Sequence, residues 1–413
     1  MPLYICVMFF LLLNGCVWDA TEEDDSYLPM DDSEYPYVGV PRIVIETDGF
    51  KDVRDEETEM PSRMQLYGPN SPVGEVLKLT IRGRGYSSFK YMAKYGLKLE
   101  LEKKQSLLGL PKNRDWVLIA NYADRTHLRN YISYKLAGWL GDEYAPRAQY
   151  VELYLNRMYM GLYLLVESVK VGKARVNISE TETSFLLEHN ATKKSDNVVF
   201  KTKKGGFYFK ICFPKNPSLE SQQLIKEHID EFESYLKEYA YFGAEPITNW
   251  MDLEDYFRFY WVQEYAKNYD GAFRRSIFLT WEKDGLIKWG PIWDFDGGFG
   301  NWDIADMPNP SNWYVRDSGW NRWLFRNEKI KRLAADYWVK NREIFNLVLD
   351  SIDVYAKRLN FVVQNDFKRW PILEEDVSPF RESYGSYADA VHSLKAWIKK
   401  RSDWIDQAVN REK

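Results

Sequence analysis

The sequence predicts an α+β protein with two lobes, because segments with the periodicity of strands come first along the chain and segments with the periodicity of helices come later. The chain has 413 residues, more than one ordinary domain uses, and its 45% hydrophobic and 28% charged residues are typical of a globular protein. We expect a strand-rich N-terminal lobe over residues 37–217, with an insertion, and a helical C-terminal lobe over residues 218–413.

Alternation of apolar and polar residues indicates the strands. In 95–102, for example, Leu97, Leu99 and Leu101 share one face and the charged residues between them share the other. Asn156-Arg157 joins two further runs as a hairpin turn. The predicted strands are 42–47, 73–85, 95–102, 116–120, 149–155, 158–168, 185–188, 198–201 and 207–213.

Helical periodicity dominates the second half of the chain. An earlier helix is predicted to begin at Asp124 as its N-cap and to end at Gly141. A hairpin is predicted over 275–289, followed by a loop over 290–310 that is rich in Gly, Trp and Asp. The other predicted helices are 219–241, 252–268 and those that follow residue 323.

The N-terminus has the pattern of an export signal. Residues 4–13 are an apolar run, too short to span a bilayer but typical of the h-region of a signal peptide. The run ends in LNGC (13–16), which resembles the bacterial lipoprotein box, so we expect a signal peptide over 1–16 and lipidation of Cys16. An ordinary signal peptide that contains a cysteine is the alternative. The acidic stretch 17–36 is predicted to be a tether, which implies a protein of the bacterial cell envelope, attached to the outer membrane or cell surface through a lipid anchor only.

Charge, histidine and cysteine usage disfavour several classes of protein. The formal net charge is −5, but residues 19–34 hold eight acidic and no basic residues, so the remainder is nearly neutral. A generic nucleic-acid-binding protein normally has a net basic body, and we expect no nucleic-acid partner. The four scattered histidines form no HExxH motif, which argues against a zinc hydrolase. Signal cleavage and lipidation would leave Cys212 as the single thiol, so no internal disulfide is expected.

Two segments carry residues suited to binding or catalysis, each with a plainer alternative. In 81–89 (IRGRGYSSF), Arg84 lies between glycines that let the backbone approach a phosphate group, although the segment is also compatible with an ordinary tight turn. The segment 264–270 (EYAKNYD) ends a predicted helix with Asn268 and Asp270, which suits either a catalytic group on a rigid platform or a simple helix cap.

A third segment, 293–301 (WDFDGGFGN), has the chemistry of a cation site. Asp294 and Asp296 are separated by one residue in a loop with three glycines, so their oxygen atoms can converge on a hard cation such as Mg²⁺. A solvated acidic turn is the alternative. The surrounding aromatic residues favour metal binding or catalysis, because aspartates placed among apolar rings usually have a function.

Taken together and in order, these segments resemble motifs of the CotH family, secreted or spore-coat proteins regarded as atypical, protein-kinase-like enzymes. The resemblance covers most of 82–301. The family's asparagine and tryptophan in RGNSSW are replaced here by Tyr86 and Phe89, and the helix over 126–140 has no glutamate to form a kinase-type lysine–glutamate pair. The matching stretches are RGRGYSSF (82–89), WVLIA (116–120), DRTHLRN (124–130), VELYLN (151–156), GLYLLVE (161–167), NYD (268–270) and PIWDFD (291–296).

The resemblance implies a two-lobed, protein-kinase-like fold and transfer of the γ-phosphoryl group of ATP to a Ser or Thr hydroxyl of a protein substrate. It implies that Asp294 and Asp296 bind Mg²⁺ or Mn²⁺ with Asn268 as a further ligand, and that Asp270 orients or deprotonates the acceptor hydroxyl. The residues that it implies at the nucleotide are Arg84 and Lys94 or Lys98 at the phosphates, and Glu167 near the adenine.

Two other functions remain open on the sequence. A catalytically silent surface protein would use the aromatic-rich loop 302–323 to bind a glycan or a partner protein, but the presence of Asp270, Asp294 and Asp296 favours an enzyme. An enzyme on the same fold could instead transfer AMP, because a kinase-like fold does not determine which phosphate is attacked.

Overall fold

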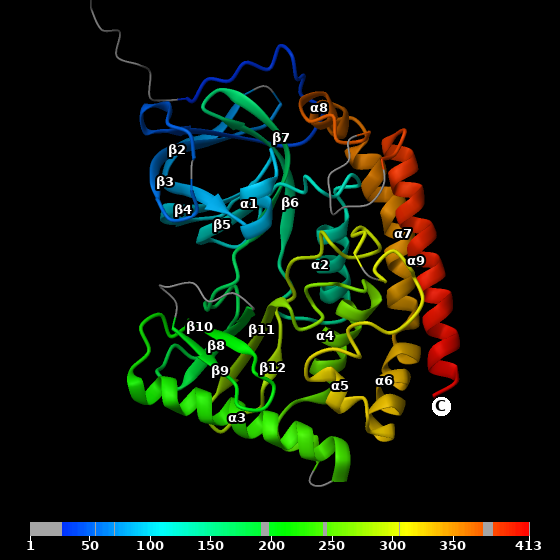
Figure 1. Ribbon diagram of the computed structural model, residues 1–413. Helices are drawn as coiled ribbons and strands as arrows, with labels where there is room; N and C mark the ends of the chain where they lie inside the picture. Colours follow the sequence, from blue (N-terminus) through cyan, green and yellow to red (C-terminus); the bar gives the residue numbers. More distant parts are fainter. Residues whose placement is uncertain are drawn as a thin grey trace, which may run out of the picture.

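The computed structural model describes residues 27–53, 55–69, 71–190, 198–242, 246–304, 306–374 and 383–412. Within these ranges strands and helices are mixed, which confirms the α+β class, and the strands form two sheets. Figure 1 shows a barrel at one end of the molecule, the second sheet at the other end and a column of helices along one side. The predicted signal peptide, Cys16 and the first part of the predicted tether lie outside the described residues.

Seven strands of the described chain close into a barrel in the order β1-β2-β3-β4-β5-β7-β6. Neighbouring strands are antiparallel, except that β1 runs parallel to β6 and so closes the barrel. Leu97, Leu99 and Leu101, predicted to share one face, are all buried in the barrel interior beside Trp116. The strands are β1 (Arg42–Thr47), β2 (Met60–Tyr67), β3 (Pro72–Arg84), β4 (Gly96–Gln105), β5 (Asn113–Ile119), β6 (Ala148–Leu155) and β7 (Met158–Glu167).

The closed barrel is a feature that the predicted two-lobed fold did not include. Local alternation predicted most of these strands but missed β2, and it carries no information on closure. Closure depends on the pairing of Arg42 in β1 with Glu152 in β6, two residues that lie 110 positions apart in the chain.

The second sheet has five strands among the described residues, in the order β12-β11-β8-β10-β9. β8 pairs with β11, as in the pair Leu187 and Leu279, so the sheet combines strands from both sides of residue 217, the predicted boundary between the lobes. The β11–β12 hairpin was predicted, whereas the pairing of β8 with β11 was not. The strands are β8 (Ser184–Asn190), β9 (Val199–Lys201), β10 (Tyr208–Phe213), β11 (Arg275–Glu282) and β12 (Lys288–Trp289).

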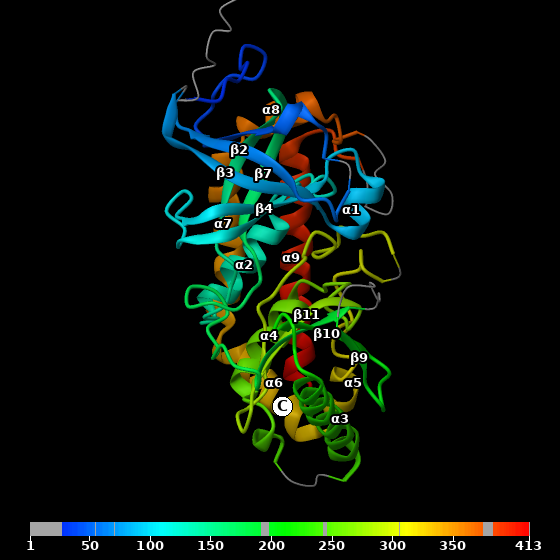
Figure 2. The ribbon, with the colours of Figure 1, turned by 90° about the vertical axis from the view of Figure 1, so that its left-hand side faces the viewer.

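Helices cover the second sheet and one side of the barrel. The aromatic helix α4 is central, with Tyr256, Trp261 and Tyr265 all buried. The long helices α7 and α9 pack together and run along the molecule (Figures 1 and 2). None of the helices in the described part of the chain has the length and apolar character needed to cross a lipid bilayer. The helices are α1 (Tyr86–Tyr91), α2 (Arg129–Trp139), α3 (Leu219–Phe242), α4 (Leu253–Tyr265), α5 (Asn321–Leu324), α6 (Glu328–Lys340), α7 (Arg342–Leu359), α8 (Val362–Arg369) and α9 (Tyr387–Asn410).

Helix α2 begins later than predicted. Its first residue is Arg129, and Asp124 lies in the preceding turn, where its carboxylate accepts hydrogen bonds from the N–H groups of Thr126 and Arg129 at 3.0 and 2.8 Å. Asp124 therefore satisfies free amides at the start of the helix, as an N-cap does, but from a position outside it.

Candidate active site

A cleft with a volume of about 330 Å³ lies between the barrel and the second sheet. The end of β3 lines it on the barrel side, and β8, β10 and β11 line it on the sheet side, together with the segment before α2 and the loop after β12. The cleft therefore collects side chains from distant parts of the sequence. The charged residues that line it are Glu56, Arg82, Arg84, Lys94, Glu188, Lys210, Asp270, Arg275, Asp294 and Asp296.

Three of the carboxylates come from the segments that the sequence analysis selected. Asp270 follows α4, while Asp294 and Asp296 follow β12. The β11–β12 hairpin between them brings the end of β12 back beside β11. A hydrogen bond of 2.9 Å from the Gly290 N–H to the Phe278 carbonyl oxygen continues this pairing. The structure thereby brings all three carboxylates to one cleft.

Asp270 is buried, Asp294 and Asp296 are partly buried, and the three carboxylates lie close enough to influence one another. Burial raises the pKa of Asp270 to about 7, with a further contribution from Asp294, while the Arg275 guanidinium at 3.2 Å opposes the shift. Burial, followed by Asp294 and Asp270, raises the pKa of Asp296 well above its usual range. Like charges crowded into a poorly solvated cleft are typical of sites that bind a cation or transfer a proton.

Basic residues face this acidic group. The Arg84 guanidinium lies over the Trp293 ring at 4.7 Å from its centroid, and burial lowers its pKa while Asp294 opposes that shift. Lys210 lines the same cleft and is paired with Glu188 across the β8–β10 ladder. Lys210 and Glu188 were not among the predicted site residues, although strand alternation in 207–213 already separates Lys210 from the buried apolar face.

The two lysines predicted at the phosphates make other contacts. Lys94 lines the cleft, but its Nζ donates to the Leu162 carbonyl oxygen at 2.6 Å and to Asp366 Oδ1 at 2.7 Å, and so ties the barrel to α8. Lys98 lies on the outer face of β4, where its Nζ is 3.6 Å from Glu59 Oε1, and it is not among the residues that line the cleft. Neither ammonium group makes a described contact with the acidic loop.

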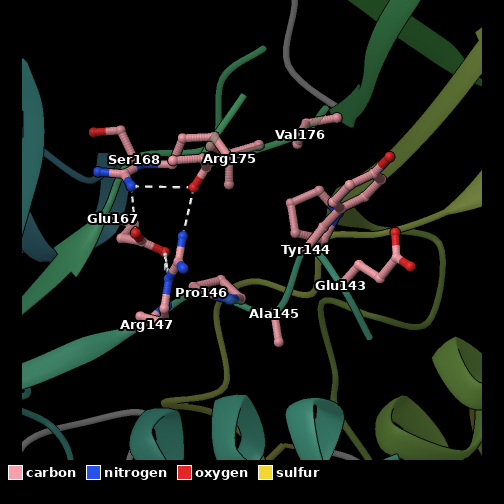
Figure 3. A pocket seen from close by; sticks show the side chains of 12 residues that line it. Glu143, Tyr144, Ala145, Pro146, Arg147, Glu167, Ser168, Arg175 and Val176 are labelled. Atoms are coloured by element: carbon pink, nitrogen blue, oxygen red, sulfur yellow. Dashed lines mark hydrogen bonds and ion pairs between the residues drawn. The ribbon is translucent and has the colours of Figure 1, made fainter. Parts of the chain in front are cut away.

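Glu167, predicted near the adenine, lies at the end of β7 in a separate small pocket. Its Oε2 accepts a hydrogen bond from Arg147 Nε at 2.9 Å, and its Oε1 is paired with Arg175. Figure 3 shows both arginines directed at this carboxylate. The structure therefore does not bring Glu167 to the group formed by Asp270, Asp294 and Asp296.

The start of α2 holds the acidic loop, a role that the sequence analysis did not assign. Arg129 Nε donates to the Gly298 carbonyl oxygen at 3.1 Å, and Asn130 Oδ1 accepts from the Phe295 N–H at 2.8 Å. Asp124 in turn accepts from Arg129 Nη1 at 2.5 Å. These are the Asp, Arg and Asn of the DRTHLRN stretch, so the motif was visible in the sequence but its contacts were not.

Asn268, predicted as a metal ligand, also contacts the acidic loop. Its Nδ2 donates to the Asp294 carbonyl oxygen at 3.0 Å and to Gln263 Oε1 at 2.9 Å. The amide nitrogen of Asn268 is therefore used to hold the protein backbone, and any contact with a metal would have to come from its amide oxygen.

The residues of the cleft fit a divalent cation that is bound together with phosphate groups. Among the described residues, no group of three His, Cys, Asp or Glu side chains is arranged to hold a metal ion by itself. Mg²⁺ is usually bound by one or two carboxylates plus substrate phosphates and water. Two carboxylates, Asp294 and Asp296, in a cleft that also holds basic side chains suit that mode of binding.

Residues 81–405 match the model of a protein family described as CotH kinase protein. The match spans most of the chain and extends from the end of β3 into α9. No curated protein matches the chain.

Proposed function

Since the chain belongs to the CotH kinase family, we propose that it is an ATP-dependent phosphotransferase that moves the γ-phosphoryl group of ATP to a Ser or Thr hydroxyl of a protein substrate. The observation that carries this proposal is the cleft in which Asp270, Asp294 and Asp296 share one space with Arg84. Phosphoryl transfer requires charge neutralisation at the phosphates and orientation of the attacking hydroxyl, and very little covalent chemistry from the protein.

In this proposal the acidic and the basic residues of the cleft have separate roles. Asp294 and Asp296 hold Mg²⁺ or Mn²⁺, which supplies positive charge at the phosphate oxygens when bound. Arg84 on the barrel side and Lys210 on the sheet side bind the phosphate groups. The proposal does not depend on Lys94, Lys98 or Glu167, whose charges are matched elsewhere.

Asp270 acts on the acceptor side of the reaction. Its carboxylate accepts the proton of the attacking hydroxyl or orients that hydroxyl, and its raised pKa of about 7 suits a group that gains and loses a proton near neutral pH. Arg275, 3.2 Å away, limits the orientations that this carboxylate can take. The barrel side and the sheet side of the cleft would then correspond to the two lobes of a kinase-like enzyme.

We also propose that the protein works in the bacterial cell envelope, attached to a membrane through a lipid on Cys16 and separated from it by the acidic segment 17–36. The support is the pattern of the first 36 residues. Replacement Cys16→Ser is expected to release the protein from the membrane fraction or to leave it unprocessed. An unchanged membrane fraction would remove the lipid anchor from the proposal.

Labelled nucleotides test the reaction itself. The protein is incubated with γ-labelled or α-labelled ATP and Mg²⁺ or Mn²⁺, and modified residues are identified by mass spectrometry. Transfer of the γ-label supports the kinase, transfer of the α-label indicates AMP transfer, and transfer of neither leaves a binding protein. Asp353→Asn, which alters an exposed carboxylate on α7 that does not line the cleft, serves as the control and should behave as wild type.

A further inference from the structure

The backbone of Asp294 has an unusual conformation. Its φ is +69°, in the left-handed region that residues other than glycine rarely adopt. Such a conformation persists only where the surrounding structure holds it, and it often occurs at functional sites. The contacts that maintain it therefore determine where the Asp294 carboxylate points.

Two asparagine side chains hold the peptide group that joins Asp294 to Phe295. Asn268 Nδ2 donates to its carbonyl oxygen at 3.0 Å, and Asn130 Oδ1 accepts from its N–H at 2.8 Å. Both asparagines are 1% exposed. One peptide group is thus fixed at both ends, and its plane cannot rotate without breaking two buried hydrogen bonds.

Each asparagine side chain is held in turn by a second hydrogen bond. Asn130 is the second residue of α2, and its Nδ2 donates to Asn121 Oδ1 at 3.2 Å. Asn268 follows α4, and its Nδ2 also donates to Gln263 Oε1 at 2.9 Å. The clamp on the peptide group is therefore built from two helices that pack against each other.

We propose that Asn130 and Asn268 are positioning residues that keep the 294–295 peptide group from rotating and so keep the Asp294 carboxylate in the cleft. Helix α2, which has no glutamate for a kinase-type ion pair, contributes an uncharged amide oxygen to the acidic loop instead. The catalytic consequence rests on the proposed function. The clamp itself does not, since it concerns the backbone of this loop.

Loss of one contact lets the peptide group rotate. The loop then populates two orientations, one in which the Asp294 carboxylate can bind the metal and one in which it cannot. A metal ion binds only the first orientation and shifts the equilibrium towards it. Because part of the binding free energy is used for this shift, the apparent affinity for the metal falls. We therefore expect Asn130→Leu to need about tenfold more Mg²⁺ for half-maximal stabilisation by ATP, while the transfer rate at saturating Mg²⁺ stays near that of wild type.

A matched control separates this effect from general damage. Asn321 is also buried, accepts from Tyr256 Oη at 2.8 Å and donates to the Val315 carbonyl oxygen at 3.0 Å, but it lies outside the cleft. Asn321→Leu should lower the melting temperature without changing the Mg²⁺ requirement. An equal change in Mg²⁺ requirement in both variants would overturn the positioning role.

Amide hydrogen exchange tests the clamp whether or not the protein transfers phosphate. In wild type the Phe295 N–H should be protected, and in Asn130→Leu it should exchange at least about tenfold faster while core amides of the barrel are unchanged. If wild type neither binds ATP with Mg²⁺ nor transfers phosphate, the proposed function is wrong. The exchange rate of the Phe295 N–H then still tests whether the two asparagines hold the peptide group. If the leucine variant does not fold, Asn130→Ala takes its place. A Phe295 N–H that is unprotected in wild type, or equally protected in the variant, rejects the clamp.

Discussion

Carboxylates in two regions of this molecule have pKa values that are shifted in opposite directions. At the end of the barrel, burial opposes ionisation of Asp366, but the adjacent Lys94 and His127 outweigh it and lower the pKa of that carboxyl to about 2. In the cleft, burial raises the pKa of Asp270 and of Asp296, and the neighbouring carboxylates add to the shift. The same kind of side chain is therefore ionised easily in one region and with difficulty in the other.

This difference in pKa shift distinguishes a carboxylate that is paired within the fold from the carboxylates of the candidate active site. Asp366 also accepts a hydrogen bond from the Leu162 N–H at 2.7 Å, so the protein itself supplies the groups that balance its charge. The carboxylates of the cleft crowd one another, and Arg275 and Arg84 balance their charge only in part, because the pKa values of Asp270 and Asp296 remain raised. We expect the first arrangement to stabilise the fold and the second to lower stability, as is common at sites that bind a ligand.

The largest expected effect comes from removing a carboxylate from the cleft. Asp294→Asn should reduce phosphoryl transfer by about 10³-fold or more, because it removes a proposed ligand of the metal that would stabilise the transition state. The unliganded variant should melt at the same temperature as wild type or slightly higher, since one repelling charge is gone. Transfer of labelled phosphate and thermal unfolding measure both. A melting temperature that rises equally with ATP and Mg²⁺ in wild type and variant would contradict this assignment.

The converse change in the scaffold should affect stability. Asp366→Asn leaves the Lys94 ammonium buried without its partner and is expected to lower the free energy of unfolding by about 3–5 kcal/mol, measured by urea denaturation. Asp353→Asn breaks an exposed pair with Lys395 and should cost only about 0–1 kcal/mol. Similar losses of unfolding free energy in the two variants would show that the Lys94–Asp366 pair contributes no more to stability than an exposed pair.

The third prediction distinguishes two roles inside the cleft. If Asp270 acts on the acceptor hydroxyl, Asp270→Asn should reduce the rate of transfer by about 10²-fold or more with nearly normal affinity for ATP and Mg²⁺. Single-turnover rates and nucleotide titrations measure the two quantities separately. Loss of nucleotide binding to the extent seen for Asp294→Asn would instead make Asp270 a metal ligand.

The smallest effect concerns a partly buried carboxylate outside both regions. Burial raises the pKa of Asp142 to about 6, although its Oδ1 accepts from the Tyr144 N–H at 2.8 Å. A carboxyl group with a raised folded-state pKa contributes stability below its ordinary value of 3.8 and loses that contribution as the pH rises through about 6, because the folded protein must then bury a charge.

The difference in the free energy of unfolding between Asp142→Asn and wild type should therefore change by about 2 kcal/mol in favour of the variant between pH 4 and pH 7.5. Asp366 has the opposite sign: its contribution is present above pH 3.8 and is lost as the pH falls towards 2. Urea denaturation of wild type and Asp142→Asn at the two pH values measures the difference. An equal difference at both values would show that Asp142 does not titrate in this range.

Local patterns predicted much of the fold and part of the site. Alternation located Leu97, Leu99 and Leu101 on the inner face of a strand, and the hairpin after Asp270 explained how that residue could meet Asp294. Local patterns could not show which of the basic residues is available to contact a phosphate group. Lys94 and Arg84 are both near the glycine-rich segment, but only their tertiary partners show that Lys94 is paired with Asp366 while Arg84 stacks on Trp293.

What the sequence by itself determined was the kind of residue available at each place: the acidic loop around Asp294, the Asn268–Asp270 stretch and the order of strands and helices. The tertiary structure decided which of these meet. Closure of the barrel through β1 and β6, the pairing of β8 with β11 that brings Lys210 to the cleft, and the contact of Asn130 with the 294–295 peptide group all join residues far apart in the chain. The periodicity of a strand or helix reports which side of that element is buried, but the partner on that side is chosen by long-range packing, which no local pattern encodes.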